Sequence, residues 1–457
     1  MKDEFEEDTI AAIATAPGPA GVSVVRISGD RSWNIGAKVA QIDDCPRSLA
    51  ETFRHVRFHA PKNGETIDDG IILFFAAPRS YTGEDVIELQ GHGGRIPAER
   101  LLAAAIEAGA RPAEPGEFTK RAFLNGKLDL SQAEAVMDLI EARTDRAATV
   151  AHEQLEGRLS QDIGSLYNDL VTVAADIENL LDFDEDEVPS GFCEKAIGRL
   201  ETLEGKAREL LANWRTGNLL REGALAVISG KPNAGKSSLL NALLGHERAI
   251  VSKIPGTTRD SIEELISIDG IPVRLVDTAG LRENSRDIIE AEGIARAGAL
   301  LKRADLHLRV IDGTLPRNAG EMVRELEGLP KDRTILILNK CDKGRATIEL
   351  PDGYRSQRLS AVTGEGLDGL RASVAMLLEA DTNVASAPEI SERHRVLLVA
   401  ATEQLGKARE CLARDAEGLV LAAQRLETAA EQLGKITGRV WSEDLLDSIF
   451  SRFCVGK

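Results

Sequence analysis

The segment from Gly230 to Ser237, Gly-Lys-Pro-Asn-Ala-Gly-Lys-Ser, constrains the fold more than any other part of the chain. It matches the pattern Gly-x-x-x-x-Gly-Lys-Ser/Thr, in which the glycines let backbone N–H groups converge on a phosphate. An apolar run typical of a buried strand, Ala224 to Ser229, comes before it, and a helical pattern over 238–244 follows. This order distinguishes a phosphate-binding loop from a glycine turn before an ordinary helix. The segment therefore predicts a nucleotide-binding α/β domain.

Three further motifs follow, the first two directly after apolar strand patterns and the third after Leu359. Asp277-Thr278-Ala279-Gly280 offers an aspartate for a water-mediated magnesium contact. In Asn339-Lys340-Cys341-Asp342, the last carboxylate can accept hydrogen bonds from both N1 and N2 of guanine. Adenine lacks this pair of donors, so the motif selects GTP, and Ser360-Ala361 resembles the last guanine contact of such domains. Together, the motifs predict a Ras-like GTPase domain with a doubly wound α/β fold.

Two groups in these motifs are expected to act on the phosphates and the magnesium ion. Lys236 would neutralise the β- and γ-phosphates, and Ser237 would bind magnesium through its hydroxyl group. The segment 256–260, Gly-Thr-Thr-Arg-Asp, supplies a loop whose Thr258 could complete the magnesium shell.

The catalytic side of this site is unusual, because Leu281 stands where related GTPases often carry a water-orienting glutamine. Another group must orient the attacking water, and a cation must offset the charge that develops between the phosphates. The candidates are a bound monovalent metal ion or one of the side chains Arg259, Arg282, Glu283 and Glu290. The residues alone do not decide between them.

The remaining sequence predicts an α+β region and a helical region. Short β-rich segments with turn signals fill residues 1–126, interrupted by a helical stretch at 98–108. From Leu155 to Leu180, apolar residues recur at alternating spacings of four and three, which predicts one long helix. Further helical patterns cover 193–214 and 392–437.

The simplest arrangement is one helical bundle, made of two chain segments, into which the α/β domain is inserted; separate helical domains are the alternative. We therefore expect three domains: 1–126, 127–220 together with 380–457, and 221–379. Within the α/β domain, His307 and Arg309 lie on a strand that should be buried on both faces, and their partners cannot be named from the sequence.

Composition restricts the environment and the partners. The net charge of −18 argues against a broad basic surface for nucleic acid, although a local basic patch or a basic partner could still bind RNA. The five cysteines form no Cys-x-x-Cys pair, which is typical of a reducing compartment. No signal peptide is apparent, and no apolar run reaches the roughly 18 residues of a membrane span. We expect a cytoplasmic protein without stable membrane association.

Blocks outside the GTPase motifs are more specific than the motifs themselves. They are Val86 to Gly94, Arg111 to Thr119, Arg121 to Leu130 and the C-terminal Phe453-Cys454-Val455-Gly456-Lys457. Together with GKPNAGKSSLLN, PGTTRD and DTAGLRE, in this order, they resemble the MnmE (TrmE) family of tRNA modification GTPases over essentially the whole chain.

The resemblance implies an N-terminal folate-binding domain, similar to aminomethyltransferases, that forms a homodimer. It also implies a helical domain carrying an inserted GTPase domain that requires Mg²⁺ and is stimulated by K⁺, with potassium in place of an arginine finger. With a flavin-dependent partner of the MnmG type, in a heterotetramer, such an enzyme would install aminomethyl or carboxymethylaminomethyl groups on carbon 5 of the wobble uridine (position 34) of certain tRNAs. The one-carbon cofactor would be 5-formyltetrahydrofolate or a related tetrahydrofolate.

The matching motifs carry the family's site residues onto this chain. Potassium would be bound by Asn233, Ser252, Ile254 and Thr257, and folate by Arg26, Glu88, Lys127 and Lys457. Glu290 would position the attacking water, and Cys454 would be a functional thiol, a general acid/base or a nucleophile. GTP would be bound by Asn233, Ala234, Gly235, Lys236, Ser237, Ser238, Ser252, Lys253, Ile254, Pro255, Gly256, Thr257, Thr258, Asp277, Thr278, Ala279, Gly280, Asn339, Lys340, Asp342, Ser360, Ala361 and Val362.

Two other functions compete with a tRNA-modifying GTPase. One is an RNA-binding GTPase of ribosome assembly, which usually carries tandem GTPase domains or a C-terminal RNA-binding domain. The other is a folate-dependent one-carbon transferase with a regulatory GTPase domain. A single GTPase domain within a helical bundle favours the tRNA-modifying enzyme.

Overall fold

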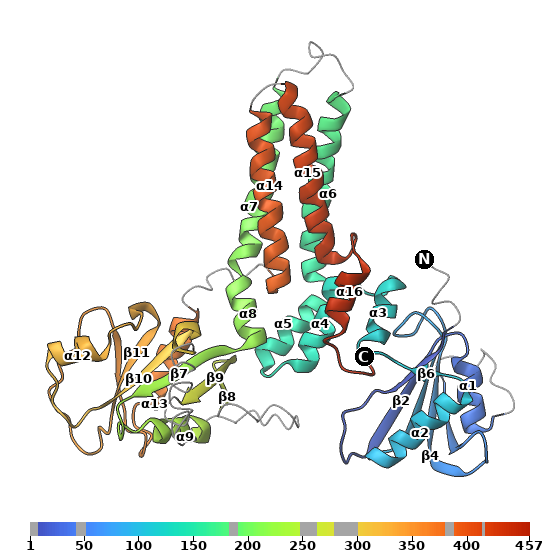
Figure 1. Ribbon diagram of the computed structural model, residues 1–457, viewed down its shortest axis with the longest axis horizontal. Helices are drawn as coiled ribbons and strands as arrows, with labels where there is room; N and C mark the ends of the chain where they lie inside the picture. The colour runs from blue at the N-terminus through green and yellow to red at the C-terminus, as the bar shows by residue number, and fades with distance from the viewer. Residues whose placement is uncertain are drawn as a thin grey trace, which may run out of the picture. The chain divides into compact units, whose positions relative to one another are not determined.

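The computed structural model describes residues 8–42, 52–181, 191–246, 263–277, 300–379, 388–413 and 416–457. The chain forms two compact units (Figure 1). The first contains residues up to Met137 together with Leu155–Gly164 and Leu433–Lys457; the second contains Asp138–Gln154 and Ser165–Gln432. The three domain ranges expected from the sequence stay predictions. None of the described helices is long and apolar enough to cross a membrane.

The first unit contains a mixed six-stranded sheet of order β3-β4-β5-β2-β1-β6. Its strands are β1 (Ile10–Ile13), β2 (Val22–Ser28), β3 (Phe53–His59), β4 (Thr66–Phe75), β5 (Val86–His92) and β6 (Arg111–Pro112). Helices α1 (Ser32–Ala40) and α2 (Arg95–Ala108) pack against the sheet. Alternate residues of β2, such as Val25 and Ile27, lie in the core between the sheet and these helices. The alternation of apolar residues that predicts a strand therefore also indicates which face of it is buried. The predicted α+β fold is confirmed here.

The C-terminus of the chain also belongs to this first unit. Helix α16 (Glu443–Phe450) packs on α3 (Glu117–Leu124), and both it and the start of α4 (Leu130–Glu141) share one apolar cluster. The backbone N–H of Phe118 donates to the carbonyl of Lys457 over 3.2 Å. Gly456 has a φ of +100°, and a Cβ there would lie 2.3 Å from the carbonyl oxygen of Ile13. Only glycine therefore lets the tail lie this close to β1.

The long helix predicted from the apolar stripe is present, but it begins after Leu155. It belongs to a group of helices that lie mostly in the second unit. The helices are α5 (Asp145–Leu155), α6 (Arg158–Leu181), α7 (Phe192–Ala212), α8 (Trp214–Glu222), α14 (Glu392–Leu412) and α15 (Ala416–Thr437). Leu155 ends α5 and does not begin the long helix, because Gly157, with a φ of +90°, separates α5 from α6. The two chain segments do share one bundle: α14 packs along α7, and α6, α7, α14 and α15 run side by side (Figure 1).

The second six-stranded sheet has the order β12-β11-β10-β7-β9-β8. Its strands are β7 (Ala224–Gly230), β8 (Glu263–Ile268), β9 (Ile271–Asp277), β10 (Leu306–Asp312), β11 (Thr334–Asn339) and β12 (Arg355–Arg358). All neighbouring pairs are parallel except β8 with β9. The helices are α9 (Lys236–His246), α12 (Ala319–Glu325) and α13 (Leu367–Glu379), with a 3₁₀ turn at Lys331–Arg333.

Both faces of this sheet are covered, as a doubly wound fold requires. On β7, Ala226 and Ile228 enter the apolar core formed with α9 and α13, whereas Leu225 and Val227 enter another cluster. Each predicted strand of the α/β domain is present, and the Ras-like fold predicted from the phosphate loop is confirmed in outline.

Two of the polar residues of β10, His307 and Arg309, alternate with apolar residues; His307 is buried and Arg309 is half-buried. Arg309 forms an ion pair of 3.2 Å with Glu325 at the end of α12. His307 is 2% exposed, and its Nδ1 has no hydrogen-bond partner among the described residues. Burial lowers the pKa of His307, and the positive charge of Arg333 lowers it further, so the ring is neutral at pH 7.

Candidate functional sites

The phosphate loop joins the end of β7 to the start of α9, the position expected of a nucleotide site at the carboxyl edge of a parallel sheet. Its last glycine is required by the packing. Gly235 has a φ of +99°, and a Cβ there would lie 2.2 Å from Nδ2 of Asn339. The loop can therefore approach β11 closely only with glycine at this position.

The groups expected at the phosphates and the magnesium ion lie together at this loop. Lys236 is buried, and its Nζ donates to the carbonyl of Lys231 over 3.1 Å, across the mouth of the loop. The hydroxyl of Ser237 donates to Oδ2 of Asp277 over 3.1 Å. A hydroxyl and a carboxylate are hard oxygen ligands, which suit Mg²⁺.

The guanine-recognition residues are joined to the phosphate loop by side-chain hydrogen bonds. Asn339 is 2% exposed; its Nδ2 donates to the carbonyl of Ala234, and its Oδ1 accepts from the N–H of Ala361, each over 3.0 Å. The hydroxyl of Ser360 donates to Oδ1 of Asp342 over 2.6 Å, which leaves the other carboxylate oxygen for a ligand. Val362, at the end of this loop, is 77% exposed.

Several predicted residues of this site lie outside the described residues, and their roles stay predictions. They are Ser252, Lys253, Ile254, Pro255, Gly256, Thr257, Thr258, Thr278, Ala279, Gly280 and the proposed water-positioning Glu290. Of the four predicted potassium ligands, Asn233 is described, and it is exposed with a φ of +61°.

Two carboxylates of this domain were not predicted from the sequence to lie at the site. Asp312, at the end of β10, lies 2.7 Å from Nζ of Lys340. Glu325 is buried and lies 2.9 Å from Nζ of Lys231 in the phosphate loop. Asp312 follows an apolar strand just as Asp277 and Asn339 do, and this repeated pattern could have identified it.

A second group of charged residues lies in the first unit, and we call Arg26, Tyr81, Glu88, Phe118 and Lys457 the Arg26 cluster. Arg26 on β2 is paired in register with Glu88 on β5, and Nε lies 3.0 Å from Oε1. The guanidinium carbon lies 5.4 Å from the ring centre of Tyr81 and 5.7 Å from that of Phe118. Such distances allow cation–π attraction.

Lys457 completes the Arg26 cluster from the end of the chain. Burial lowers the pKa of Lys457, and the charge of Arg26 lowers it further, while Glu88 and Cys454 act in the opposite direction. The cluster thus holds two basic side chains, one carboxylate and two aromatic rings, a composition suited to an anionic, aromatic ligand. The structure brings three of the predicted folate contacts together, and it adds Tyr81 and Phe118, for which no sequence signal was apparent.

The other two predicted residues of this region lie at its margin. Lys127, the fourth predicted folate contact, donates from Nζ to the carbonyl of Pro78 over 2.9 Å, on the loop that carries Tyr81. Cys454 is exposed, and its carbonyl accepts from the N–H of Gly116 over 3.4 Å. Neither arrangement assigns a chemical role to the Cys454 thiol.

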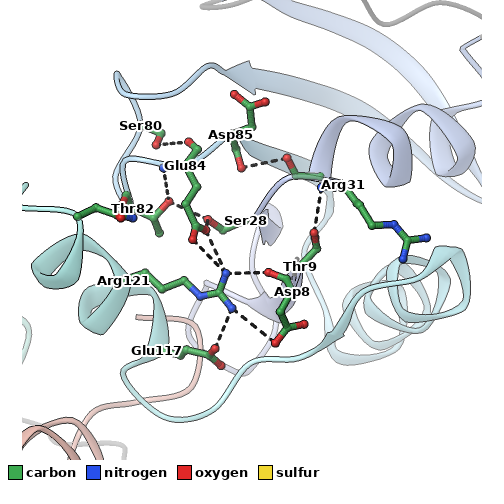
Figure 2. Close-up of polar contacts among 12 residues, drawn as sticks. Asp8, Thr9, Ser28, Arg31, Ser80, Thr82, Glu84, Asp85, Glu117 and Arg121 are labelled. Carbon is green, nitrogen blue, oxygen red and sulfur yellow. Dashed lines mark hydrogen bonds and ion pairs between the residues drawn. The ribbon is translucent and has the colours of Figure 1, made fainter. Parts of the chain in front are cut away.

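The loop that carries Tyr81 is held by a buried ion network. Figure 2 shows the guanidinium of Arg121 among Glu84, Glu117 and Asp8, with donor distances of 3.1 Å to Glu84, 3.0 Å to Glu117 and 2.9 Å to the carbonyl of Asp8. Ser28 on β2 also donates to Glu84, over 2.7 Å. Burial acts to raise the pKa of Glu117, but hydrogen bonds from Arg111 and others outweigh it and lower that pKa. The network therefore holds Glu84, three residues after Tyr81, through hydrogen bonds from Ser28 and Arg121.

Comparisons with known proteins give matches over nearly the whole chain. A family model described as "MnmE helical domain" matches residues 130–454, and one described as "GTP-binding protein TrmE N-terminus" matches residues 9–127. The chain is 43% identical over 469 residues to "tRNA modification GTPase MnmE" of Burkholderia mallei, covering 99% of each chain. It is 45% identical over 455 residues to the protein of the same name from Nitrosomonas eutropha, covering 98% of this chain and 99% of that one.

One solved structure that matches is that of Era from Aquifex aeolicus, bound to GDP and AlF₄⁻. It is 24% identical, covers 40% of this chain and 66% of its own, and has a TM-score of 0.24. A score this low supports no argument about fold or function.

Proposed function

This chain belongs to the MnmE family of tRNA modification GTPases, and we propose that it hydrolyses GTP to drive modification of carbon 5 of the wobble uridine in certain tRNAs. The observation that best supports the GTPase step is the assembly at the edge of the second sheet. There, Asn339 joins the phosphate loop at Ala234 to the guanine-binding loop at Ala361, each over 3.0 Å. A single residue thereby sets the spacing between phosphate and base recognition.

Magnesium fits the residues at the phosphate end of this site. We propose that Ser237 binds the ion directly and that Asp277 binds it through water, with Thr258 completing the set. When bound, the ion would supply positive charge that offsets the charge of the phosphates during hydrolysis. The Ser237–Asp277 hydrogen bond supports this assignment, because it already holds both oxygen ligands at one point.

Potassium is proposed to supply the positive charge that no arginine of the phosphate loop provides. Asn233 would bind it together with Ser252, Ile254 and Thr257, and Glu290 would orient the water. The exposure of Asn233 supports this role, because a ligand from solution can reach its side chain.

The Arg26 cluster is the proposed folate site. Arg26, Lys457 and Lys127 would attract the carboxylates or the electron-rich ring of 5-formyltetrahydrofolate or a related one-carbon tetrahydrofolate, and Glu88 would accept from its ring N–H groups. We also propose a homodimer that acts with a flavin-dependent partner on tRNA. These assignments rest on the family and on the composition of the cluster.

The wobble-uridine function is tested by nucleoside analysis of tRNA from cells that lack this protein. We expect the modified wobble uridine to disappear, to return with the wild-type gene, and to stay absent with Lys236→Ala. Lys407→Ala, on the exposed side of α14, is the matched control and should restore modification. Intact modification in the deletion strain would contradict the proposal and favour a ribosome-assembly GTPase.

Folate binding is tested separately by calorimetric titration of the whole protein with 5-formyltetrahydrofolate. Arg26→Gln should weaken binding at least roughly ten-fold, the loss expected for a charge-assisted contact. Arg95→Gln is the control, because the Arg95 side chain is 82% exposed and pairs with Glu99 on its own helix. Equal affinities for the two variants would exclude the Arg26 cluster as the site.

A further inference from the structure

The ammonium group of Lys340 is held between two acceptors from distant parts of the chain. Nζ donates to the carbonyl of Asn233 in the phosphate loop and to Oδ2 of Asp312 at the end of β10, each over 2.7 Å. The three residues lie on three different segments, and the two bonds join them. The carboxylate of Asp312 therefore orients the Lys340 side chain, and the same ammonium group binds the phosphate loop at Asn233.

Asp312 is itself held rigidly. Its Oδ1 accepts from both the N–H and the hydroxyl of Thr314, over 3.0 and 2.6 Å, so that only Oδ2 is directed at Lys340. Burial alone would raise the pKa of Asp312, but the hydrogen bonds from Lys340 and Thr314 lower it to about 2. The carboxylate is consequently charged at neutral pH.

The segments that these bonds join have an unfavourable backbone conformation. Asn233 has a φ of +61° and Lys340 a φ of +69°, in the left-handed region that residues other than glycine seldom adopt. Such conformations persist when surrounding contacts hold them. The contact from Lys340 to the carbonyl of Asn233 acts on both residues at once, and Asp312 keeps that contact aligned.

We propose that Asp312 is a positioning residue of the GTPase site, which acts through Lys340 to hold the phosphate loop at Asn233 in its nucleotide-binding shape. Asp312 does not touch the nucleotide in this assignment. Its loss would leave Lys340 free to turn away, and the bound nucleotide would leave faster. The proposal depends on the GTPase reaction alone and not on folate, potassium or tRNA.

The direct test is the isosteric variant Asp312→Asn in the full chain, with a fluorescent GDP analogue as the probe. We expect release of the analogue to be roughly ten-fold faster, as for the loss of one charge-assisted hydrogen bond, and KM for GTP to rise while kcat changes less than about two-fold. The control Asp368→Asn removes a carboxylate on α13 that is 92% exposed, and it should release the analogue at the wild-type rate.

A double-mutant cycle with Lys340→Gln distinguishes positioning from general destabilisation. If Asp312 acts through Lys340, Asp312→Asn adds little to the release rate of Lys340→Gln. If the two effects multiply in full, or if Asp312→Asn releases the analogue at the wild-type rate, the proposal is wrong. Should Asp312→Asn fail to fold, Thr314→Val replaces it in the same cycle. It keeps the carboxylate and the bond from the backbone N–H but removes the hydroxyl that helps to orient Oδ1, and the same two outcomes decide.

Discussion

Nδ2 of Asn339 donates to the carbonyl of Ala234 over 3.0 Å, a bond between residues 105 positions apart in the chain. This bond sets how closely the phosphate loop approaches β11. It requires a residue without a side chain at the next position of the loop, and Gly235 satisfies that requirement.

Gly235→Ala should abolish nucleotide binding and lower stability. The new Cβ would lie 2.2 Å from Nδ2 of Asn339, and the φ of +99° would strain any side chain. We expect a loss of at least about 1 to 3 kcal/mol, measured by thermal unfolding and by titration with a fluorescent GDP analogue. Gly245→Ala, in α9, is the control: nothing lies within 4 Å of its Cβ, and the helix should gain a few tenths to about 1 kcal/mol. Wild-type binding by Gly235→Ala would show that the loop can move away from β11.

Asp342→Asn should change the preferred base from guanine to xanthine. The carboxylate accepts from two donors of guanine, whereas an amide can accept from N1–H and donate to the carbonyl that xanthine carries at carbon 2. The bond from Ser360 to this side chain has an acceptor in either form, so the loop should keep its position. We expect GTP affinity to fall at least roughly ten-fold and affinity for xanthosine triphosphate to rise. Competition between the two nucleotides measures the change, and an unaltered preference would remove Asp342 from base recognition.

Glu389 should make the stability of the second unit depend on pH. Its Oε2 is buried without a hydrogen-bond partner among the residues that the structure describes, beside a cavity of about 30 Å³ lined by residues that include Gln154 and Arg221. Burial raises the pKa of Glu389 to about 7, although Arg146 and Arg221 act to lower it. Because the folded state binds the proton more tightly than the unfolded state, whose pKa is near 4.5, stability should fall as pH rises from about 4.5 to 7.

The size of this pH effect should be roughly 2 to 3 kcal/mol, and Glu389→Gln should remove it. Chemical denaturation at pH 5 and pH 8 measures both variants. Glu427→Gln, at an exposed position of α15, should keep the wild-type dependence. If Glu389→Gln retained that dependence as well, the carboxyl would be ionised in the folded state at both pH values.

Arg121→Met should destabilise the first unit strongly. The Arg121 side chain is 3% exposed and pairs with Glu84 and Glu117. Its removal takes away the ion pair of Glu84 and one of the two arginines that pair with Glu117, which keeps Arg111. Breaking such a network costs about 3 to 5 kcal/mol. Thermal unfolding should show the loss, whereas Arg95→Met, on the exposed face of α2, should change stability by less than about 0.5 kcal/mol. A small effect of Arg121→Met would mean that water solvates these carboxylates.

The loop that carries Tyr81 links this network to the proposed folate site. Conservative replacement by Arg121→Lys keeps the charge but loses the planar set of donors that reaches Glu84, Glu117 and the carbonyl of Asp8. We expect weaker binding of 5-formyltetrahydrofolate than in the wild type, with the affinity measured well below the unfolding temperature of the variant. Wild-type affinity would show that the loop keeps Tyr81 in place without the network.

The sequence by itself determined those features of the protein that depend on residues adjacent in the chain. The phosphate loop, its flanking strand and helix, and the guanine selection by Asp342 could be predicted because each depends on neighbours along the chain. The apolar patterns also predicted β7, β9, β10 and β11 of the α/β sheet and the helices of the bundle, but not β8 or β12. Leu155 was assigned to the wrong helix, because the apolar period continues across the break at Gly157. The spacing of apolar residues indicates which face of a helix or strand is buried, but it does not indicate where the backbone turns.

Only the tertiary structure placed Asp312 beside Lys340, Glu325 beside Lys231, and Lys457 near Arg26. The residues of each pair are far apart in the sequence but close in space. The order of the strands in the sheets and the connections between them bring these segments together. For a single charged residue at the end of a strand or in a C-terminal tail, the sequence does not indicate whether the side chain is solvated or forms an ion pair. Their partners are decided when the apolar faces of the sheets and helices are buried, because burial fixes which strand ends meet.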